Sequence, residues 1–204
     1  MQAMTLVSVL VLGLVAIAGC SGSGGTVITP SPTGQPPRAI APAHLPSLFP
    51  TATEVGDALG LEVEAMGVQA DMSQAWEHID ITPGALVAKH VQGYRWPPGG
   101  TGGAPADAIA GVLIDIDLFR SPVDGAAYGV KVAATVSGTA FSTGLSADRV
   151  TTGSWTSDQG FGGSTIAVQA GSIVVLVTAF RTGATELEAA AEEIAALILA
   201  GIDG

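Results

Sequence analysis

Residues 164–180 are the part of the chain that most restricts its fold. They read STIAVQAGSIVVLVTAF, a run rich in valine, isoleucine and other apolar residues that is interrupted only by Gly171 and Ser172. β-branched and aromatic residues favour strands, and a glycine-containing pair between two such runs is typical of a hairpin turn. The sequence therefore predicts two antiparallel strands here, and with them a sheet built by antiparallel pairing.

Other segments have the composition of strands that could join this hairpin. Residues 86–96 and 112–119 are rich in valine, isoleucine, leucine and aromatic residues, so each is predicted to form a strand. Residues 61–64 and 78–81 are weaker candidates because both runs are short.

Three helices are predicted from their capping residues. Thr51 is followed three residues later by Glu54, which is a capping-box pattern, and Thr185 and Glu188 repeat that spacing. Ser121 followed by proline is also typical of a helix start. Apolar stripes at helical spacing then predict the buried faces of the three helices: Val55 with Leu59; Val123, Ala127, Val130 and Ala134; and Leu187, Ala191, Ile194 and Ile198.

The order of these elements predicts the fold class. Helices separated by runs of strands indicate an α+β domain, with a mostly antiparallel sheet and about three helices packed on one face. A strictly alternating βαβ arrangement fits less well. Residues 119–121 and 180–182 share a Phe-Arg-hydroxyl pattern between a predicted strand and a predicted helix, which suggests a repeated unit.

The N-terminal segment predicts export. Residues 4–18 are uncharged and apolar but shorter than the ~20 residues that a bilayer-spanning helix needs, which is typical of a signal-peptide core. Residues 17–20 (Ile17-Ala18-Gly19-Cys20), which overlap the end of this segment, resemble the lipobox of bacterial lipoprotein signals. The resemblance implies cleavage before Cys20, a diacylglycerol on its sulfur, and anchoring to the extracytoplasmic face of the cell membrane by two or more acyl chains.

This reading divides the chain into three regions. Residues 1–19 are expected to be the signal peptide. Residues 20–46 comprise the lipidated Cys20 and a tether rich in Ser, Gly and Pro. Residues 47–204 are expected to form the extracytoplasmic domain.

Charge and cysteine content exclude several functions. The 18 Asp and Glu residues outnumber the 7 Lys and Arg residues, and a formal net charge of −11 repels nucleic-acid phosphates and anionic lipid head groups. Nucleic acid is therefore not an expected partner, and a covalent anchor is needed at a membrane. Because Cys20 is the only cysteine, we expect no disulfide and no cysteine metal site. The richness in Ala and Gly, with only two lysines, suggests an actinobacterial source.

The domain also resembles the small sensor-type domains of exported actinobacterial lipoproteins and receptor kinases. The likeness lies in LFPTATEVGDALG, DLFRSPVDGAAYG and IAVQAGSIVVLVTAF, followed by a final helix rich in Ala and Glu. The cysteine pairs common in the kinase sensor type are absent from this chain. The resemblance implies a sensing or binding role and assigns no ligand.

Asp115 and Asp117 are the most suggestive pair of carboxylates. On one strand face they could act as acid and base or hold a divalent ion. The alternation of these residues with Ile114, Ile116 and Leu118 favours a simpler interpretation, a half-buried strand with one wet side. In that interpretation Arg120 or Arg149 neutralises the carboxylates.

Two other polar sets could bind an ion but are also explained by ordinary structural roles. His78 and Asp80, with His90, could supply nitrogen and oxygen ligands to a metal, but isolated histidines more often serve structural roles. Arg120 and Arg181 each precede a predicted helix and together could hold an anion, although pairing with nearby acids is favoured. No metal or other cofactor is therefore expected.

Aromatic residues supply the candidate ligand site. Tyr94 and Trp96 would share one strand face, while Trp155 and Phe161 flank a glycine-rich loop. Such residues could stack on a sugar ring or another apolar ligand, and the alternative is that they simply anchor the core.

These features favour a membrane-anchored envelope lipoprotein with a non-catalytic domain that binds or senses a ligand or partner. A cell-wall component, a lipid or an envelope protein would be its partner. Standard catalytic motifs are missing from the sequence. The alternatives are a metal-dependent envelope hydrolase that uses Asp115 and Asp117, and a structural lipoprotein without a small-molecule site.

Overall fold

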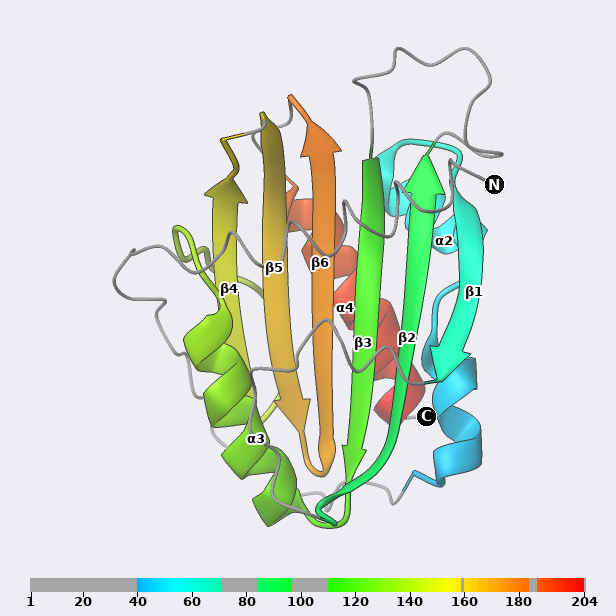
Figure 1. Cartoon of the computed structure of the whole chain (residues 1–204), viewed down its shortest axis with the longest axis vertical. Coiled ribbons are helices and arrows are strands. Elements are labelled where there is room, and N and C mark those ends of the chain that lie inside the picture. The colour runs from blue at the N-terminus through cyan, green and yellow to red at the C-terminus, as the bar shows by residue number, and fades with distance from the viewer. Residues whose placement is uncertain (1–39, 71–83, 97–109, 159, 184–186, 204) are drawn as a thin grey trace.

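The protein is described here by a computed structural model that covers residues 40–70, 84–96, 110–158, 160–183 and 187–203. Its strands form one antiparallel sheet in the order β1-β2-β3-β6-β5-β4 (Figure 1). The predicted α+β class is confirmed. The strands are β1 (Glu64–Ala70), β2 (Leu86–Trp96), β3 (Ala110–Phe119), β4 (Arg149–Thr156), β5 (Phe161–Ala170) and β6 (Ile173–Thr182).

The strongest strand predictions are confirmed. β5 and β6 form the expected hairpin, and Gly171 takes the positive φ of 57° that the tight turn requires. β2 has the predicted bounds, and β3 begins two residues earlier than predicted. Of residues 61–64, only Glu64 belongs to a strand, and residues 78–81 lie outside the described parts of the chain. β4 was not predicted.

Within the described residues, four helices accompany the sheet: the 3₁₀ helix η1 (Pro42–Leu48), α2 (Ala52–Leu59), α3 (Pro122–Thr135) and α4 (Glu188–Asp203). Both hydrogen bonds of the capping box at Thr51 and Glu54 are present. The Ser121 side chain accepts a hydrogen bond from the backbone N–H of Asp124 at the start of α3. Thr185, the third predicted cap, lies outside the described residues.

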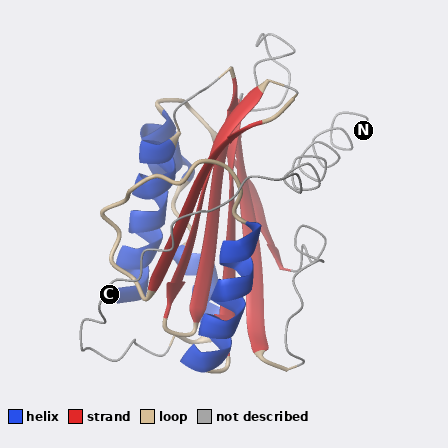
Figure 2. Cartoon of the chain, turned by 90° about the vertical axis from the view of Figure 1, so that its left-hand side faces the viewer, coloured by secondary structure: helices blue, strands red, loops and turns tan. Residues whose placement is uncertain are grey.

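The helices lie on both faces of the sheet (Figure 2). η1, α2 and α4 pack on one face around an apolar core that includes Ile114, Ile166 and Ile194. The helix α3 lies on the opposite face, mainly over β5 and β6, where Tyr128 and Val132 are buried. The prediction of helices on one face therefore holds for η1, α2 and α4 and not for α3.

The buried face of α3 differs from the predicted stripe. Val123, Ala127, Val130 and Ala134 are exposed, whereas Gly125, Tyr128, Gly129 and Val132 face the sheet. The glycines explain the difference, because they let the helix approach the β5–β6 turn closely. A Cβ atom added at Gly125 would lie 2.8 Å from the carbonyl oxygen of Gly171.

The folded domain extends into residues that the composition assigned to the tether. Leu45 and Leu48 of η1 are buried in the core beneath α4. The domain thus begins before residue 47. Residues 1–39, which include Cys20 and the lipobox, lie outside the described residues. No described helix is long and apolar enough to cross a membrane.

The element order supports the repeated unit suggested by the Phe-Arg-hydroxyl pattern. Three consecutive strands followed by a helix occur twice, as β1–β2–β3–α3 and as β4–β5–β6–α4. The two three-strand groups meet where β3 pairs with β6. Their helices lie on opposite faces, so the repetition concerns order rather than full geometry.

Candidate functional site

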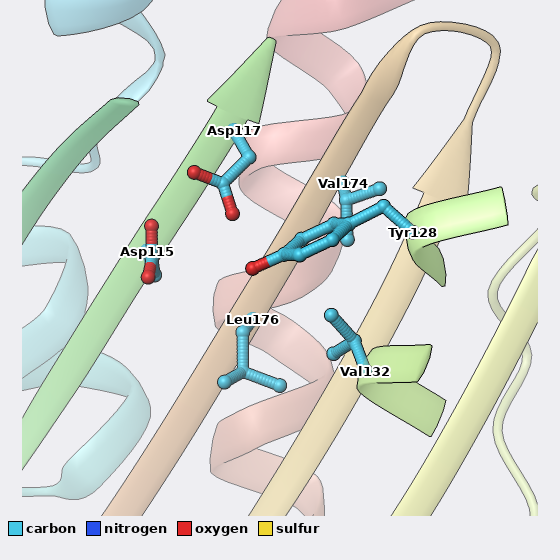
Figure 3. Close-up of a pocket in the computed structure, with 6 residues that line it drawn as sticks. All are labelled: Asp115, Asp117, Tyr128, Val132, Val174 and Leu176. Carbon is cyan, nitrogen blue, oxygen red and sulfur yellow. The ribbon is translucent and has the colours of Figure 1, made fainter. Parts of the chain in front are cut away.

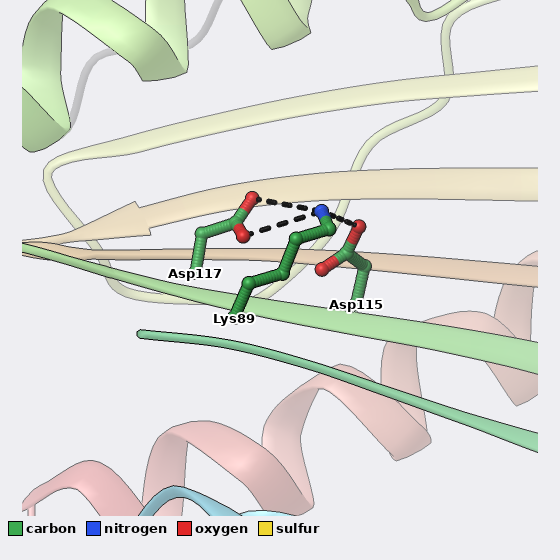
Figure 4. Close-up of polar contacts among 3 residues, drawn as sticks. All are labelled: Lys89, Asp115 and Asp117. Carbon is green, nitrogen blue, oxygen red and sulfur yellow. Dashed lines mark hydrogen bonds and ion pairs between the residues drawn. The ribbon is translucent and has the colours of Figure 1, made fainter. Parts of the chain in front are cut away.

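A buried charged cluster lies on the α3 side of the sheet and is formed by Lys89, Asp115, Asp117 and Tyr128. Lys89 on β2 is directly opposite Asp117 on β3 in the strand register, and Asp115 is two residues earlier on the same face of β3. The Lys89 ammonium donates a hydrogen bond to Asp115 and lies 3.2 Å from Asp117 Oδ1 (Figure 4). One ammonium is thus shared by two carboxylates.

Helix α3 completes the cluster through Tyr128. Its ring packs against Phe119 with the ring centroids 4.8 Å apart, and its hydroxyl hydrogen-bonds Asp117. Figure 3 shows the hydroxyl directed toward the two carboxylates across a small cavity. The cavity measures about 10 Å³ and is also lined by Val132, Val174 and Leu176. This is room for about one water molecule.

Burial dominates the electrostatics of the cluster. Asp115 and Asp117 are each only 3% exposed. Burial disfavours the charged form of Lys89, but the two neighbouring carboxylates outweigh this effect and raise its pKa above the ordinary value. Burial also raises the pKa of Asp117, because the one shared ammonium and the Tyr128 hydroxyl only partly offset it. Lys89 therefore stays charged, and Asp117 takes up a proton more readily than an ordinary aspartate does.

Tyr128 acts as a hydrogen-bond donor in this cluster. Burial, and then the negative charges of Asp117 and Asp115, raise the pKa of Tyr128 above its ordinary value. The phenol is consequently neutral at physiological pH and keeps its proton for Asp117. The cluster as a whole carries two potential negative charges and one positive charge beneath α3.

This arrangement does not suit the metal-dependent hydrolase that was considered as an alternative. The Lys89 ammonium stands where a cation bound by Asp115 and Asp117 would lie, and a metal ion would have to displace it. The adjoining cavity accommodates a water molecule and no substrate. Within the described residues, no group of three or more His, Cys, Asp or Glu side chains is placed to hold a metal ion.

Two expectations about Asp115 and Asp117 are wrong. Their side of β3 is buried rather than exposed to solvent, because α3 packs over that face of the sheet. Their partner is Lys89 rather than Arg120 or Arg149. Arg120 instead donates to the carbonyl oxygen of Gly84, and Arg149 begins β4 at the far edge of the sheet.

Arg120 and Arg181 are too far apart to form the joint anion site that was the less favoured interpretation of these residues. Arg120 directly follows the end of β3, while Arg181 pairs with Ala110 at the beginning of that strand. The length of β3 separates them, which is about 30 Å at ~3.4 Å per residue.

The structure does not bring the four candidate aromatic residues together. Tyr94 and Trp96 lie on β2, while Phe161 and Trp155 lie on β5 and β4, across β3 and β6. β2 and β4 are four strand spacings apart, or about 19 Å at ~4.8 Å each. Tyr94 is buried and donates its hydroxyl hydrogen to the carbonyl oxygen of Pro50, and Trp96 packs against the same core.

Trp155 and His90, two further candidate residues, lie on different strands and make separate local contacts. Trp155 packs over Gly163 and donates a hydrogen bond from Nε1 to Thr165 Oγ1 at 3.2 Å. His90 lies on β2, where it pairs with Ile116, so its side chain is on the face opposite to that of Lys89. His78 and Asp80, the other two members of the metal set considered with His90, lie outside the described residues.

A hollow of ligand size lies at the surface beside α2. Its volume is about 520 Å³, and small-molecule sites commonly span ~300–1,000 Å³. Asp57 and Glu62 are its charged residues. The lining also includes Ala52, Thr53, Gly56, Gly60, Leu61 and Val63.

Comparison with known proteins shows a relationship at the level of the fold. No protein-family model matches the chain, and no curated protein matches its sequence. The extracellular domain of PknH from Mycobacterium tuberculosis is structurally similar, with a TM-score of 0.57 and 14% sequence identity. The match covers 81% of this chain and 97% of that domain. This neighbour, an extracellular domain from an actinobacterium, agrees in coarse terms with the resemblance seen in the sequence.

Proposed function

We propose that this protein is a cell-envelope lipoprotein, anchored outside the cytoplasmic membrane through lipid on Cys20, whose domain binds a ligand or a partner and performs no catalysis. The proposed location outside the cytoplasmic membrane rests on the sequence Ile17-Ala18-Gly19-Cys20 and the apolar segment before it. The similarity in fold to an extracellular domain supports this location.

One observation carries the choice of binding over catalysis. Asp115 and Asp117, the paired carboxylates that sequence reasoning considered for a hydrolase, are both bonded to Lys89 in the interior of the domain. Carboxylates engaged in this way hold β2, β3 and α3 together and are closed to a substrate. A binding or sensing role requires no such catalytic pair.

The hollow beside α2 is the place we propose for a small ligand. It is open to solvent, and Thr53 is an exposed residue on its rim. Its two carboxylates, Asp57 and Glu62, would favour a ligand with a hydroxyl or amino group over an anionic one. Cell-wall glycan fragments, and lipids with such head groups, have these groups.

The location and the ligand can be tested separately. Mass spectrometry of the mature N-terminus is expected to find acyl chains on Cys20, and Cys20→Ala is expected to lack these acyl chains and to keep residues 1–19 attached. A lipid-free wild-type chain in the medium would contradict the proposed location. Native mass spectrometry of the full chain, extracted gently from membranes, is expected to show a bound small molecule.

The matched variants Thr53→Trp and Ala196→Trp then locate that ligand. Thr53→Trp fills part of the hollow and should lower its occupancy. Ala196 is exposed on α4, so Ala196→Trp should leave the occupancy unchanged. Retention of the ligand in Thr53→Trp would place the site elsewhere, and absence of any ligand under all conditions would favour a structural role.

A further inference from the structure

The outer side of α3 carries an apolar stripe that no described part of the chain covers. Val123 is 77% exposed and Val130 is 50% exposed, and Ala127 and Ala134 between and beyond them are also exposed. These four residues are called the α3 stripe below. The opposite side of the same helix already packs on the sheet through Tyr128 and Val132. The stripe is thus a second apolar face of α3, which the described part of the chain leaves unused.

The spacing of the stripe is that of a helix–helix seam. Its members follow one another by four, three and four residues, which is the a/d spacing of a heptad repeat. Such spacing keeps one line of side chains directed at a partner helix along its whole length. Valine and alanine alternate along the line, so each large residue can lie opposite a small one when the partner helix runs antiparallel.

The charges beside the stripe favour a second copy of the same chain as its partner. Asp124 and Lys131 are seven residues apart, so they lie on the same side of the helix, and they are its only charged residues. A two-fold axis across the stripe places Asp124 of each copy near Lys131 of the other. In contrast, α2 and α4 contain acidic residues and no Lys or Arg, so pairing through either would bring like charges together.

We propose that two copies of this protein associate through antiparallel contact of their α3 helices. Each stripe then forms layers in which Val123 of one copy meets Ala134 of the other, and Ala127 meets Val130. The same surface patch is used on both copies, as in a two-fold symmetric dimer. α3 lies on the face of the sheet opposite α4, and none of the described elements lies outside it (Figure 2).

The contact between the two α3 helices is small, so the dimer should form mainly where the local concentration of the protein is high. A helix of 14 residues is about 21 Å long at ~1.5 Å per residue. A seam of that length buries less than the ~1,000 Å² expected for a stable interface, so the pair should be weak in dilute solution. Attachment to one membrane surface would raise the effective concentration of the copies. The pairing itself does not depend on the lipid, and it goes beyond the proposed ligand-binding role.

Cysteine cross-linking of the full chain in membranes tests this proposal. Two differently tagged copies are co-expressed, one with Ala127→Cys and the other with Val130→Cys, and mild oxidation is applied. The antiparallel seam predicts several-fold more mixed disulfide dimer from this pair than self-linked dimer from Ala127→Cys alone. Adding Val123→Asp to both copies should abolish the excess, while circular dichroism verifies the fold.

Two controls measure the disulfide formation that does not depend on contact between the α3 helices. The unmodified chain shows whether Cys20 itself forms disulfides. Val87→Cys lies on β2 with 48% exposure, close to that of Val130, and reports random collisions between copies. Mixed dimer no greater than in the Val87→Cys control would overturn the proposal, as would preferential self-linking of Ala127→Cys. The mass of the mature N-terminus in the same samples reports whether Cys20 is lipidated. An error in the proposed membrane anchoring can therefore be distinguished from an error in the proposed dimer.

Discussion

Lys89 and Asp117 face each other across the β2–β3 pair, with the ammonium nitrogen of Lys89 3.2 Å from Asp117 Oδ1 on the side covered by α3. The same nitrogen also bonds Asp115. Removal of Lys89 would take away a positive charge that two buried carboxylates share, and the raised pKa of Asp117 makes the charge of the cluster depend on pH. The stability of the domain should therefore respond both to loss of Lys89 and to pH.

Replacement of Lys89 by methionine is expected to destabilise the domain by about 3–5 kcal/mol at pH 7, because two buried carboxylates lose their counter-charge. The loss should be smaller near pH 4, because the raised pKa of Asp117 makes its protonated, neutral form more populated there. Chemical denaturation at the two pH values measures both effects. The control Lys131→Met changes an exposed lysine on α3 and should shift the unfolding free energy by no more than ~0.5 kcal/mol. Equal, small losses for both variants would show that the cluster contributes little.

Replacement of Asp117 by asparagine should change the pH dependence of stability. The folded-state pKa of Asp117 is raised, so the folded protein binds this proton more tightly than the unfolded chain does. Stability from this group is present below its unfolded pKa, near 3.8, and is lost as pH rises through the folded value. Relative to Asp117→Asn, the wild-type protein should become less stable over that rise. The unfolding free energies of the two proteins, measured by chemical denaturation at several pH values in this range, should therefore change differently with pH. An identical pH dependence for both would contradict the raised pKa of Asp117.

Removal of the Tyr128 hydroxyl isolates one hydrogen bond of the cluster. Tyr128→Phe keeps the ring contact with Phe119 and loses the bond to Asp117, with an expected cost of about 1–2 kcal/mol. Tyr128→Ala also loses the packing beneath α3 and should cost about 3–5 kcal/mol. Thermal or chemical unfolding distinguishes the two variants. If they were equally stable, α3 would not be held through this side chain.

The elements that the sequence predicted correctly share strong local signals. The β5–β6 hairpin combines strand composition with a glycine turn, and α2 has a complete capping box. β4 lacked such a signal, because RVTTGSWT is mostly small and polar. Thr151 and Thr152 are nevertheless almost fully buried, which their composition does not indicate. Local composition therefore identifies an apolar strand and overlooks a polar one that is buried by its neighbours.

The charged cluster was predictable only in part. Asp115 and Asp117 stood out because their spacing puts both on one face of a strand. Lys89 did not, since its position opposite Asp117 depends on the register of two strands, which the sequence of either strand does not define. For α3, the valines and alanines suggested one buried face, while Gly125 and Gly129 actually contact the hairpin. Their spacing around Tyr128 was the signal that could have identified the buried side.

The packing of α3 on the hairpin gives a final prediction, at Gly125. Replacing glycine by alanine inside an exposed helix usually stabilises a protein by up to ~1 kcal/mol, because alanine has the higher helix propensity. At Gly125 the added Cβ would lie 2.8 Å from the Gly171 carbonyl oxygen and 3.1 Å from Ser172 Cα, both of them backbone atoms of a tight turn.

Gly125→Ala should therefore reverse the usual sign and destabilise the domain by about 1–3 kcal/mol, as overpacking commonly does. The matched control is Gly201→Ala in α4, where the nearest atom is the end of the flexible Leu48 side chain at 3.2 Å. That variant should be neutral or slightly stabilising. Chemical denaturation of the two variants measures the change in unfolding free energy. A stabilising Gly125→Ala would mean that α3 does not approach the hairpin this closely.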